Sequence, residues 1–129
     1  MIVLDSSAAC DMVRKTEEGM AFRALMLSEE KVISCELLRA EVVSIFRKLC
    51  RHGLIPIEKV QSFLTESTAL VNEYYSIQEL QEEVLSESIR LDHSSYDMFY
   101  FVLARRFGAT LFTLDRKLIR LCEEQGVQC

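Results

Sequence analysis

The stretch SSYDMFYFVLARRFGATLFTLDRKL, residues 94–118, decides how this chain folds. It predicts a helix over Ser94–Phe107 that ends at a glycine, as helix C-termini prefer, and then a short apolar strand over Thr110–Thr113. Asp97 lies in the first turn of that helix, and Asp115 comes just after the strand. Acidic residues that follow short buried strands are typical of ligand sites in open α/β sheets.

The same alternation of short apolar runs and amphipathic helices continues through the rest of the chain. The expected strands are Ile2–Leu4, Lys31–Ser34, Tyr74–Ile77 and Thr110–Thr113, with Val127–Gln128 as a candidate edge strand. The expected helices are Ser7–Lys15, Glu17–Leu27, Glu36–His52, Ile57–Glu73, Glu79–Arg90, Ser94–Phe107 and Arg116–Glu124, the first two forming a hairpin broken near Gly19. We therefore predict an α/β fold in one domain, residues 1–129, with a central, mostly parallel sheet of about five strands flanked by helices.

Composition limits the classes of function. The chain has 129 residues, half of them hydrophobic, which is enough for one domain with a sizeable core. Its net charge of −5 argues against a protein that coats nucleic acid through a basic surface. Bound divalent cations would offset most of this charge, so the acidic balance says little against a metal-dependent nuclease.

Cysteine usage and hydropathy indicate a reduced, cytoplasmic protein with no membrane segment. The five cysteines form an odd set without CxxC spacing, so neither a disulfide framework nor a zinc site is expected. Four of them are expected to behave as small buried hydrophobes: Cys10, Cys35, Cys50 and Cys122. The N-terminus shows no signal sequence, and no apolar run approaches the roughly 18 residues of a membrane span.

Four acidic residues are the candidate functional groups: Asp5, Glu41, Asp97 and Asp115. Each lies just after an expected strand or in a helix beside one, so we expect the four carboxylates to meet at one edge of the sheet. Carboxylates gathered there repel one another unless a hard cation neutralises them, and Mg²⁺ or Mn²⁺ is the usual solution. We predict a metal-dependent catalytic site with these four residues as ligands.

Helix capping is the ordinary alternative for three of these acids. Asp5 and Asp115 each precede a helix and suit an N-cap, while Asp97 follows Ser94 by three residues, as in a variant capping box. Glu41 differs because its helix offers no cation at the neighbouring turns. Placing this carboxylate beside an apolar stripe requires compensation, which a metal ion would supply.

Other polar and aromatic residues carry weaker expectations. Ser7 and Thr113 are candidates to support the site, through hydroxyls that orient a carboxylate or water. His93 is interpreted as a loop residue. The aromatic residues near Asp97 are expected to fill the core or an interface instead of stacking on bases: Tyr96, Phe99, Tyr100 and Phe101. Basic side chains are interpreted mainly as solvated helix faces, with phosphate contacts as the alternative: Arg39, Arg47, Lys48, Arg51, Arg105 and Arg106.

The motifs resemble those of PIN domains. Residues 95–104, SYDMFYFVLA, and 108–118, GATLFTLDRKL, are similar to the C-terminal signature of that family. VLDSSA at 3–8 resembles its opening strand, and AEV at 40–42 its glutamate-bearing helix. The details are closest to the virulence-associated (VapC-type) toxin subunits of toxin–antitoxin pairs.

The resemblance implies a ribonuclease that depends on Mg²⁺ or Mn²⁺, with Asp5, Glu41, Asp97 and Asp115 in the catalytic site. It also implies an RNA substrate, a cognate antitoxin and a homodimeric toxin. Two alternatives stay open: a PIN nuclease of housekeeping RNA maturation, and a non-catalytic PIN scaffold that only binds a partner. A phosphorelay receiver or a haloacid-type phosphatase would need further acids beside Asp5, where the chain has Ser6 and Ser7.

Overall fold

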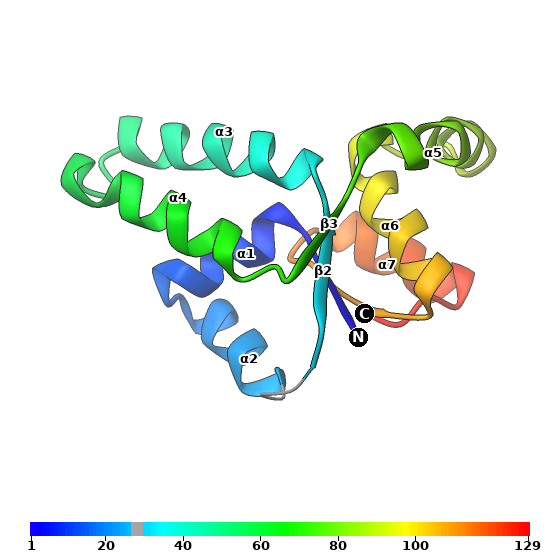
Figure 1. Cartoon of the computed structure of the whole chain (residues 1–129), viewed down its shortest axis with the longest axis horizontal. Coiled ribbons are helices and arrows are strands. Elements are labelled where there is room, and N and C mark those ends of the chain that lie inside the picture. The colour runs from blue at the N-terminus through cyan, green and yellow to red at the C-terminus, as the bar shows by residue number, and fades with distance from the viewer. Residues whose placement is uncertain (27–29) are drawn as a thin grey trace.

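The computed structural model describes residues 1–26 and 30–129, and its elements alternate between helix and strand (Figure 1). The strands are β1 (Ile2–Leu4), β2 (Val32–Cys35), β3 (Glu73–Tyr75) and β4 (Thr110–Phe112). The helices are α1 (Ser6–Arg14), α2 (Glu17–Leu25), α3 (Leu37–Arg51), α4 (Val60–Ala69), α5 (Ile77–Leu91), α6 (Ser95–Phe107) and α7 (Arg116–Gln125), with a 3-10 turn, η1 (Ile57–Lys59).

The strands form one parallel sheet with the order β3-β2-β1-β4. Helices α1 to α4 cover one face and α5 to α7 the other (Figure 1). The central strands β1 and β2 are buried along their whole length, which explains their mostly apolar sequence. The exception is Ser34, whose hydroxyl donates to the Leu4 carbonyl at 2.6 Å. Because β1 lies between β2 and β4, the residue that follows it is held at the middle of the carboxyl edge.

Helix α6 forms the centre of the core. Every residue from Met98 to Ala104 is buried, so the helix is enclosed on all sides. Its first turn carries Asp97, and its contacts with β1, β2 and β4 bring that turn toward the sheet. Cys10, Cys35 and Cys122 are buried, as the sequence predicts, whereas Cys50 is only half-buried. Within the described ranges, no helix combines the length and apolarity needed to span a membrane.

The α/β prediction is confirmed, with differences in the number and ends of the elements. The described residues contain four strands instead of about five. Val127–Gln128 is not a strand: the Gln128 carbonyl accepts one hydrogen bond from Leu111 N–H at 2.8 Å, and a single bond does not make a ladder. The predicted helix Ile57–Glu73 ends at Ala69, because Glu73 pairs with β2 as the start of β3.

The α1–α2 hairpin also differs from its prediction. The break lies at Lys15, which has the left-handed conformation, and Gly19 lies inside α2. A Cβ atom added to Gly19 would stand 2.0 Å from the Asp11 carbonyl oxygen, so this glycine allows the two helices to approach each other. The expected helix end at Leu27 lies outside the described residues, and α2 ends at Leu25.

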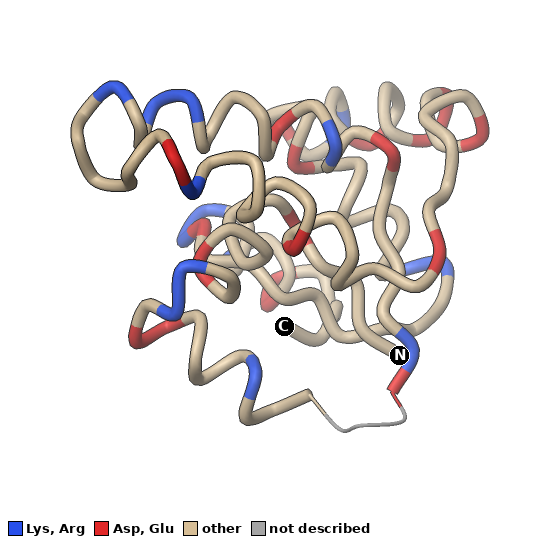
Figure 2. Tube along the Cα trace, turned by 60° about the vertical axis from the view of Figure 1, so that its left-hand side comes forward, with Lys and Arg blue, Asp and Glu red and all other residues tan. Residues whose placement is uncertain are grey.

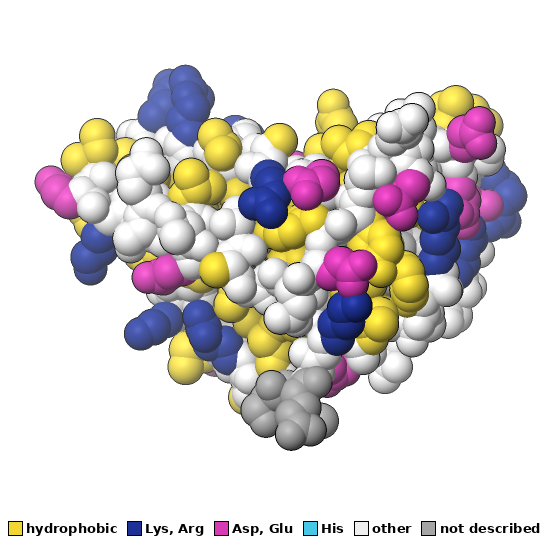
Figure 3. All heavy atoms as spheres, in the orientation of Figure 1, with side chains coloured by type: hydrophobic (Ala, Val, Ile, Leu, Met, Phe, Trp, Pro, Cys, Tyr) yellow, Lys and Arg dark blue, Asp and Glu magenta, His cyan; other side chains and the backbone are white. Residues whose placement is uncertain are grey.

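Charged residues are unevenly distributed. Figure 2 shows acidic positions in the interior of the trace as well as at its rim, whereas Lys and Arg lie mainly at the periphery. The molecular surface is hollowed between the α3 and α5 sides (Figure 3), the side toward which β2 and β3 run into their following helices. The candidate acids are found near this carboxyl edge.

Candidate active site

Asp5 occupies the position directly after β1. Its side chain is 5% exposed, and its Oδ1 atom accepts hydrogen bonds from Ala8 N–H at 2.9 Å and from Ser7 Oγ at 2.7 Å. The carboxylate is therefore the N-cap of α1, so the capping interpretation of this residue is confirmed. Both of these hydrogen bonds go to Oδ1, so capping does not use the second carboxylate oxygen and does not exclude a further role for Asp5.

The environment of Asp5 opposes its negative charge. Burial raises the pKa of this carboxyl to about 6, although the Ala8 N–H and the hydroxyls of Thr113 and Ser7 act in the opposite direction. The charge of Asp97 raises it further. Asp5 is thus a buried acid with a second acid nearby, a combination that a cation would relieve.

Glu41 joins three helices. It lies on α3, and its Oε1 atom accepts hydrogen bonds from the Tyr100 hydroxyl on α6 and from Ser6 Oγ on α1, the latter at 3.2 Å. These two hydroxyls supply the compensation for burial that the sequence analysis assigned to a metal ion, so the burial of Glu41 does not by itself require one. Burial still raises the pKa of Glu41, and the charge of Asp97 adds to that effect.

Asp97 pairs with a histidine outside its own helix. Its Oδ2 atom lies 3.0 Å from His93 Nε2, and the His93 side chain is only 12% exposed. Burial raises the pKa of Asp97, His93 lowers it, and the charge of Asp115 raises it. Ser94 makes no side-chain capping bond, so the predicted variant capping box is wrong: the partner of Asp97 is His93.

Asp115 lies at the exposed end of the group. Its Oδ1 atom accepts a hydrogen bond from Leu118 N–H at 3.0 Å, which makes it the N-cap of α7. Its own N–H donates to Thr113 Oγ1 at 3.0 Å. Ser7 Oγ accepts from Leu114 N–H at 3.1 Å while donating to Asp5. The two candidate supporting hydroxyls therefore connect the β4–α7 loop to the end of β1.

Asp97 is the electrostatic centre of the four acids. Its charge raises the pKa values of Asp5 and Glu41, and its own pKa is raised by Asp115. The oxygen donors suit a hard divalent cation in chemistry. In residues 1–26 and 30–129, however, no three His, Cys, Asp or Glu side chains form a ready-made metal-binding group. Within the described residues, the four carboxylates therefore do not form a preassembled set of metal ligands.

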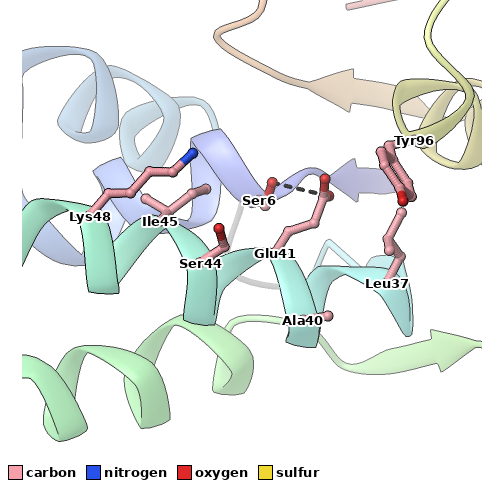
Figure 4. Close-up of a pocket in the computed structure, with 8 residues that line it drawn as sticks. All are labelled: Ser6, Leu37, Ala40, Glu41, Ser44, Ile45, Lys48 and Tyr96. Atoms are coloured by element: carbon pink, nitrogen blue, oxygen red, sulfur yellow. Dashed lines mark hydrogen bonds between the residues drawn. The ribbon is translucent and has the colours of Figure 1, made fainter.

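A pocket of about 440 Å³ opens beside Glu41 (Figure 4). Its lining comes mainly from α3 and includes hydroxyl, ammonium and aromatic groups: Ser6, Leu37, Ala40, Glu41, Ser44, Ile45, Lys48 and Tyr96. The Ser6–Glu41 hydrogen bond forms part of its wall (Figure 4). The acidic group therefore continues into a cavity that can accept part of a ligand.

Sequence reasoning missed the roles of two residues and left the place of a third open. Tyr100 was assigned to the core and is buried there, but its hydroxyl also holds Glu41. His93 was interpreted as a plain loop residue, although its spacing of four from Asp97 was a usable signal. Tyr96 was expected in the core or at an interface; it is 61% exposed and therefore lies outside the core, unlike Phe99 and Phe101.

The sequence of the chain matches the PIN domain family model over residues 2–124. The chain belongs to the PIN domain family. Ribonuclease VapC3 from Pyrobaculum aerophilum is 24% identical over 119 residues, which cover 91% of each chain. The resemblance to this nuclease family that the motifs indicate is confirmed, and the similarity to VapC ribonucleases is distant.

Two solved structures share the fold. The PAE2754 protein of Pyrobaculum aerophilum aligns with a TM-score of 0.68 and 21% identity, covering 91% of this chain and 76% of that one. VapC20 of Mycobacterium tuberculosis, a toxin that cleaves the sarcin–ricin loop, aligns with a TM-score of 0.66 and 17% identity. That alignment covers 94% of this chain and 95% of VapC20. The shared architecture therefore extends over almost the whole PIN domain.

Proposed function

We propose that this PIN domain is an endoribonuclease that hydrolyses RNA phosphodiester bonds with Mg²⁺ or Mn²⁺, and that it is the toxin of a type II toxin–antitoxin pair. The observation that carries the nuclease proposal is the group of four acids. In this group the charge of Asp97 raises the pKa values of both Asp5 and Glu41. The similarity to ribonuclease VapC3 supports the choice of RNA, and the fold shared with the toxin VapC20 supports the toxin role.

Asp5 and Asp97 are the proposed central ligands, with Glu41 and Asp115 completing the site. A divalent cation held there would supply activation of water and neutralisation of charge on the phosphate. The chain's own residues orient the ligands: Ser7 and the Ala8 N–H hold Asp5, and His93 holds Asp97. Each acid thus has a fixed partner that limits its movement before substrate arrives.

The substrate we propose is a structured RNA with an unpaired loop. VapC20 is named for cleaving such a loop, and an open edge flanked by a pocket suits extruded nucleotides better than a closed duplex. The proposed partners are an antitoxin and a second copy of this chain. Exposed apolar side chains next to α3 and α4, among them Val43, Leu54 and Ile57, offer surface for such contacts.

A cleavage assay tests the nuclease proposal. Labelled structured RNA is incubated with the protein in Mg²⁺ or Mn²⁺, and in EDTA. We expect metal-dependent products with 5′-phosphate and 3′-hydroxyl ends, and a loss of orders of magnitude in Asp5→Asn and Asp97→Asn. Glu36→Gln is the matched control, because Glu36 is an acid near the start of α3 that pairs with Arg39 at 2.8 Å. Wild-type cleavage by folded Asp97→Asn protein would contradict the proposal.

Partner measurements test the toxin assignment separately. Light scattering reports the oligomeric state, and co-expression with the protein encoded by an adjacent short reading frame reports antitoxin binding. We expect a dimer and a copurifying partner that suppresses cleavage. A strict monomer over a broad concentration range would argue against the dimer. An active nuclease that captures no such partner would favour a role in RNA maturation.

A further inference from the structure

One face of α3, beside the buried stripe that contains Leu38, Val42 and Phe46, is mostly polar. Glu41, Ser44, Ile45 and Lys48 recur at the spacing of a single helix face, and all four line the 440 Å³ pocket. This face therefore opens into a cavity instead of closing against a neighbouring element. Lys48 is two turns beyond Glu41, about 10 Å along the helix axis.

The groups in the pocket are arranged in a line. Figure 4 shows Lys48 and Tyr96 at opposite ends of the lining, with the Ser6–Glu41 hydrogen bond between them. The Tyr96 side chain is 61% exposed and immediately precedes Asp97 in α6. An extended ligand that crosses the acids would therefore meet an aromatic ring on one side and an ammonium group on the other.

Lys48 is available to an anion. Among the described residues that line the pocket it alone is cationic, and it forms no ion pair with any of them. Three of the other basic side chains considered for phosphate contacts are engaged: Arg39 pairs with Glu36, and Arg105 and Arg106 pair with Glu83. The remaining two, Arg47 and Arg51, do not line this pocket. Since the acids repel phosphate, Lys48 and the Ser44 hydroxyl mark where a backbone phosphate can be held.

We propose that this pocket binds single-stranded RNA on both sides of the scissile phosphate, a proposal that rests on the nuclease function above. Lys48 and Ser44 contact the phosphate on one side, and Tyr96 stacks on an unpaired base on the other. Lysine binds phosphate as a point charge, and aromatic rings stack on the bases of single strands with little regard to sequence. The pocket thus sets the register of the strand over the acids.

Binding without cleavage is the appropriate test. A fluorescent single-stranded RNA of about ten nucleotides is titrated in Mg²⁺ into protein that carries Asp97→Asn, so that turnover does not consume the probe. We expect Lys48→Gln to weaken binding about tenfold and to lower the slope of log Kd against log salt by about 0.7. Tyr96→Leu should weaken binding at least about fivefold through lost stacking.

Conservative and distant variants serve as controls. Lys48→Arg and Tyr96→Phe keep the charge and the ring, so both should bind as the parent does. Lys59→Gln removes an exposed lysine of η1 that does not line the pocket. Otherwise wild-type protein with Lys48→Gln should show a raised KM for RNA with kcat retained.

The outcomes separate this proposal from the nuclease proposal. If Lys48→Gln and Tyr96→Leu bind RNA as tightly as Lys59→Gln, the pocket proposal is overturned even when wild-type protein cleaves RNA. Selective weakening by these two variants supports the pocket even if the cleavage assay fails. Loss of a copurifying protein partner with RNA affinity unchanged would assign the pocket to that partner and overturn the proposal.

Discussion

The Tyr100 hydroxyl donates a hydrogen bond to Glu41 Oε1 and so connects the core helix α6 to α3 across the carboxyl edge of the sheet. The two residues are 59 positions apart in the sequence. Tyr100 is 2% exposed, so its position is fixed by the core. The orientation of one candidate catalytic acid therefore depends on the packing of a helix whose central residues lie in the core.

Tyr100→Phe tests this connection. Removing a donor to a half-buried carboxylate should cost about 1.5–3 kcal/mol of unfolding free energy at neutral pH, and RNA cleavage should fall as Glu41 loses its orientation. Urea denaturation and cleavage rates measure the two effects. Tyr96→Phe, which removes an exposed hydroxyl, should change stability little. The effect of Tyr100→Phe should shrink in a Glu41→Gln background, and an undiminished effect there would show that the hydrogen bond is not its cause.

Asp5→Asn should change how stability varies with pH. Burial raises the pKa of Asp5 to about 6 in the folded protein, from the ordinary value of 3.8 for an aspartate side chain. Between these values the folded state binds more protons than the unfolded state, so stability is lost as pH rises from about 4 to about 6. The full loss is about 3 kcal/mol.

The Asn side chain keeps the N-cap and removes this charge, so the variant without metal should be more stable than wild type at pH 7 and similar at pH 4. The pKa values of Glu41 and Asp97 are also raised, so the pH dependence of the variant should be reduced and not abolished. Urea denaturation in EDTA across pH 4 to 8 measures both proteins. Identical pH profiles would contradict the assignment.

Divalent cations should stabilise the protein. An ion that binds only the folded state raises the unfolding free energy by about 1.4 kcal/mol at a tenfold excess over its Kd. Thermal melts over a Mn²⁺ titration measure this shift. Asp97→Asn should reduce the shift, because Asp97 is coupled to both Asp5 and Glu41, whereas Glu36→Gln should retain it. A melting temperature independent of Mn²⁺ in wild-type protein would argue against a metal site.

Gly19→Ala should destabilise the α1–α2 hairpin. The added methyl group would meet the Asp11 carbonyl, a backbone atom that cannot turn aside, so α2 must shift. We expect a loss of about 1–3 kcal/mol despite the better helix propensity of alanine. Ala21→Ser, at an exposed position of the same helix, is the control. Unchanged urea midpoints for Gly19→Ala would show that the hairpin relaxes without cost.

The sequence alone was sufficient for the fold class and for the positions of the acids on their elements. Asp5 and Asp115 follow β1 and β4 as expected, because short apolar runs that end in an acid are a local pattern. The partners of the acids are not local. The Tyr100–Glu41 bond depends on how α6 and α3 pack together, and apolar periodicity indicates which face of a helix is buried but not which hydroxyl meets it.

The number of strands and the exposure of Tyr96 could not be predicted for a related reason. Val127 and Gln128 follow α7 and could extend the sheet. A strand, however, needs a continuous ladder of backbone hydrogen bonds, which depends on how the segment lies beside β4. Tyr96 lies in the first turn of a helix whose middle, Met98–Ala104, is buried on every side, whereas both ends of that helix emerge from the core. Both outcomes are set by the position of an element within the assembled fold.

The complete burial of Met98–Ala104 has a consequence for hydrogen exchange. Backbone amides in this segment have no solvent-facing side, so they should exchange only when the whole domain unfolds. In α2 only Gly19 is buried. The backbone amides of α2 should therefore exchange through local opening, whose free energy is much lower than that of global unfolding. Asp97, the acid carried on α6, directly precedes this buried segment. Local fluctuations can loosen the hairpin at the periphery while the centre of the acidic group stays in place.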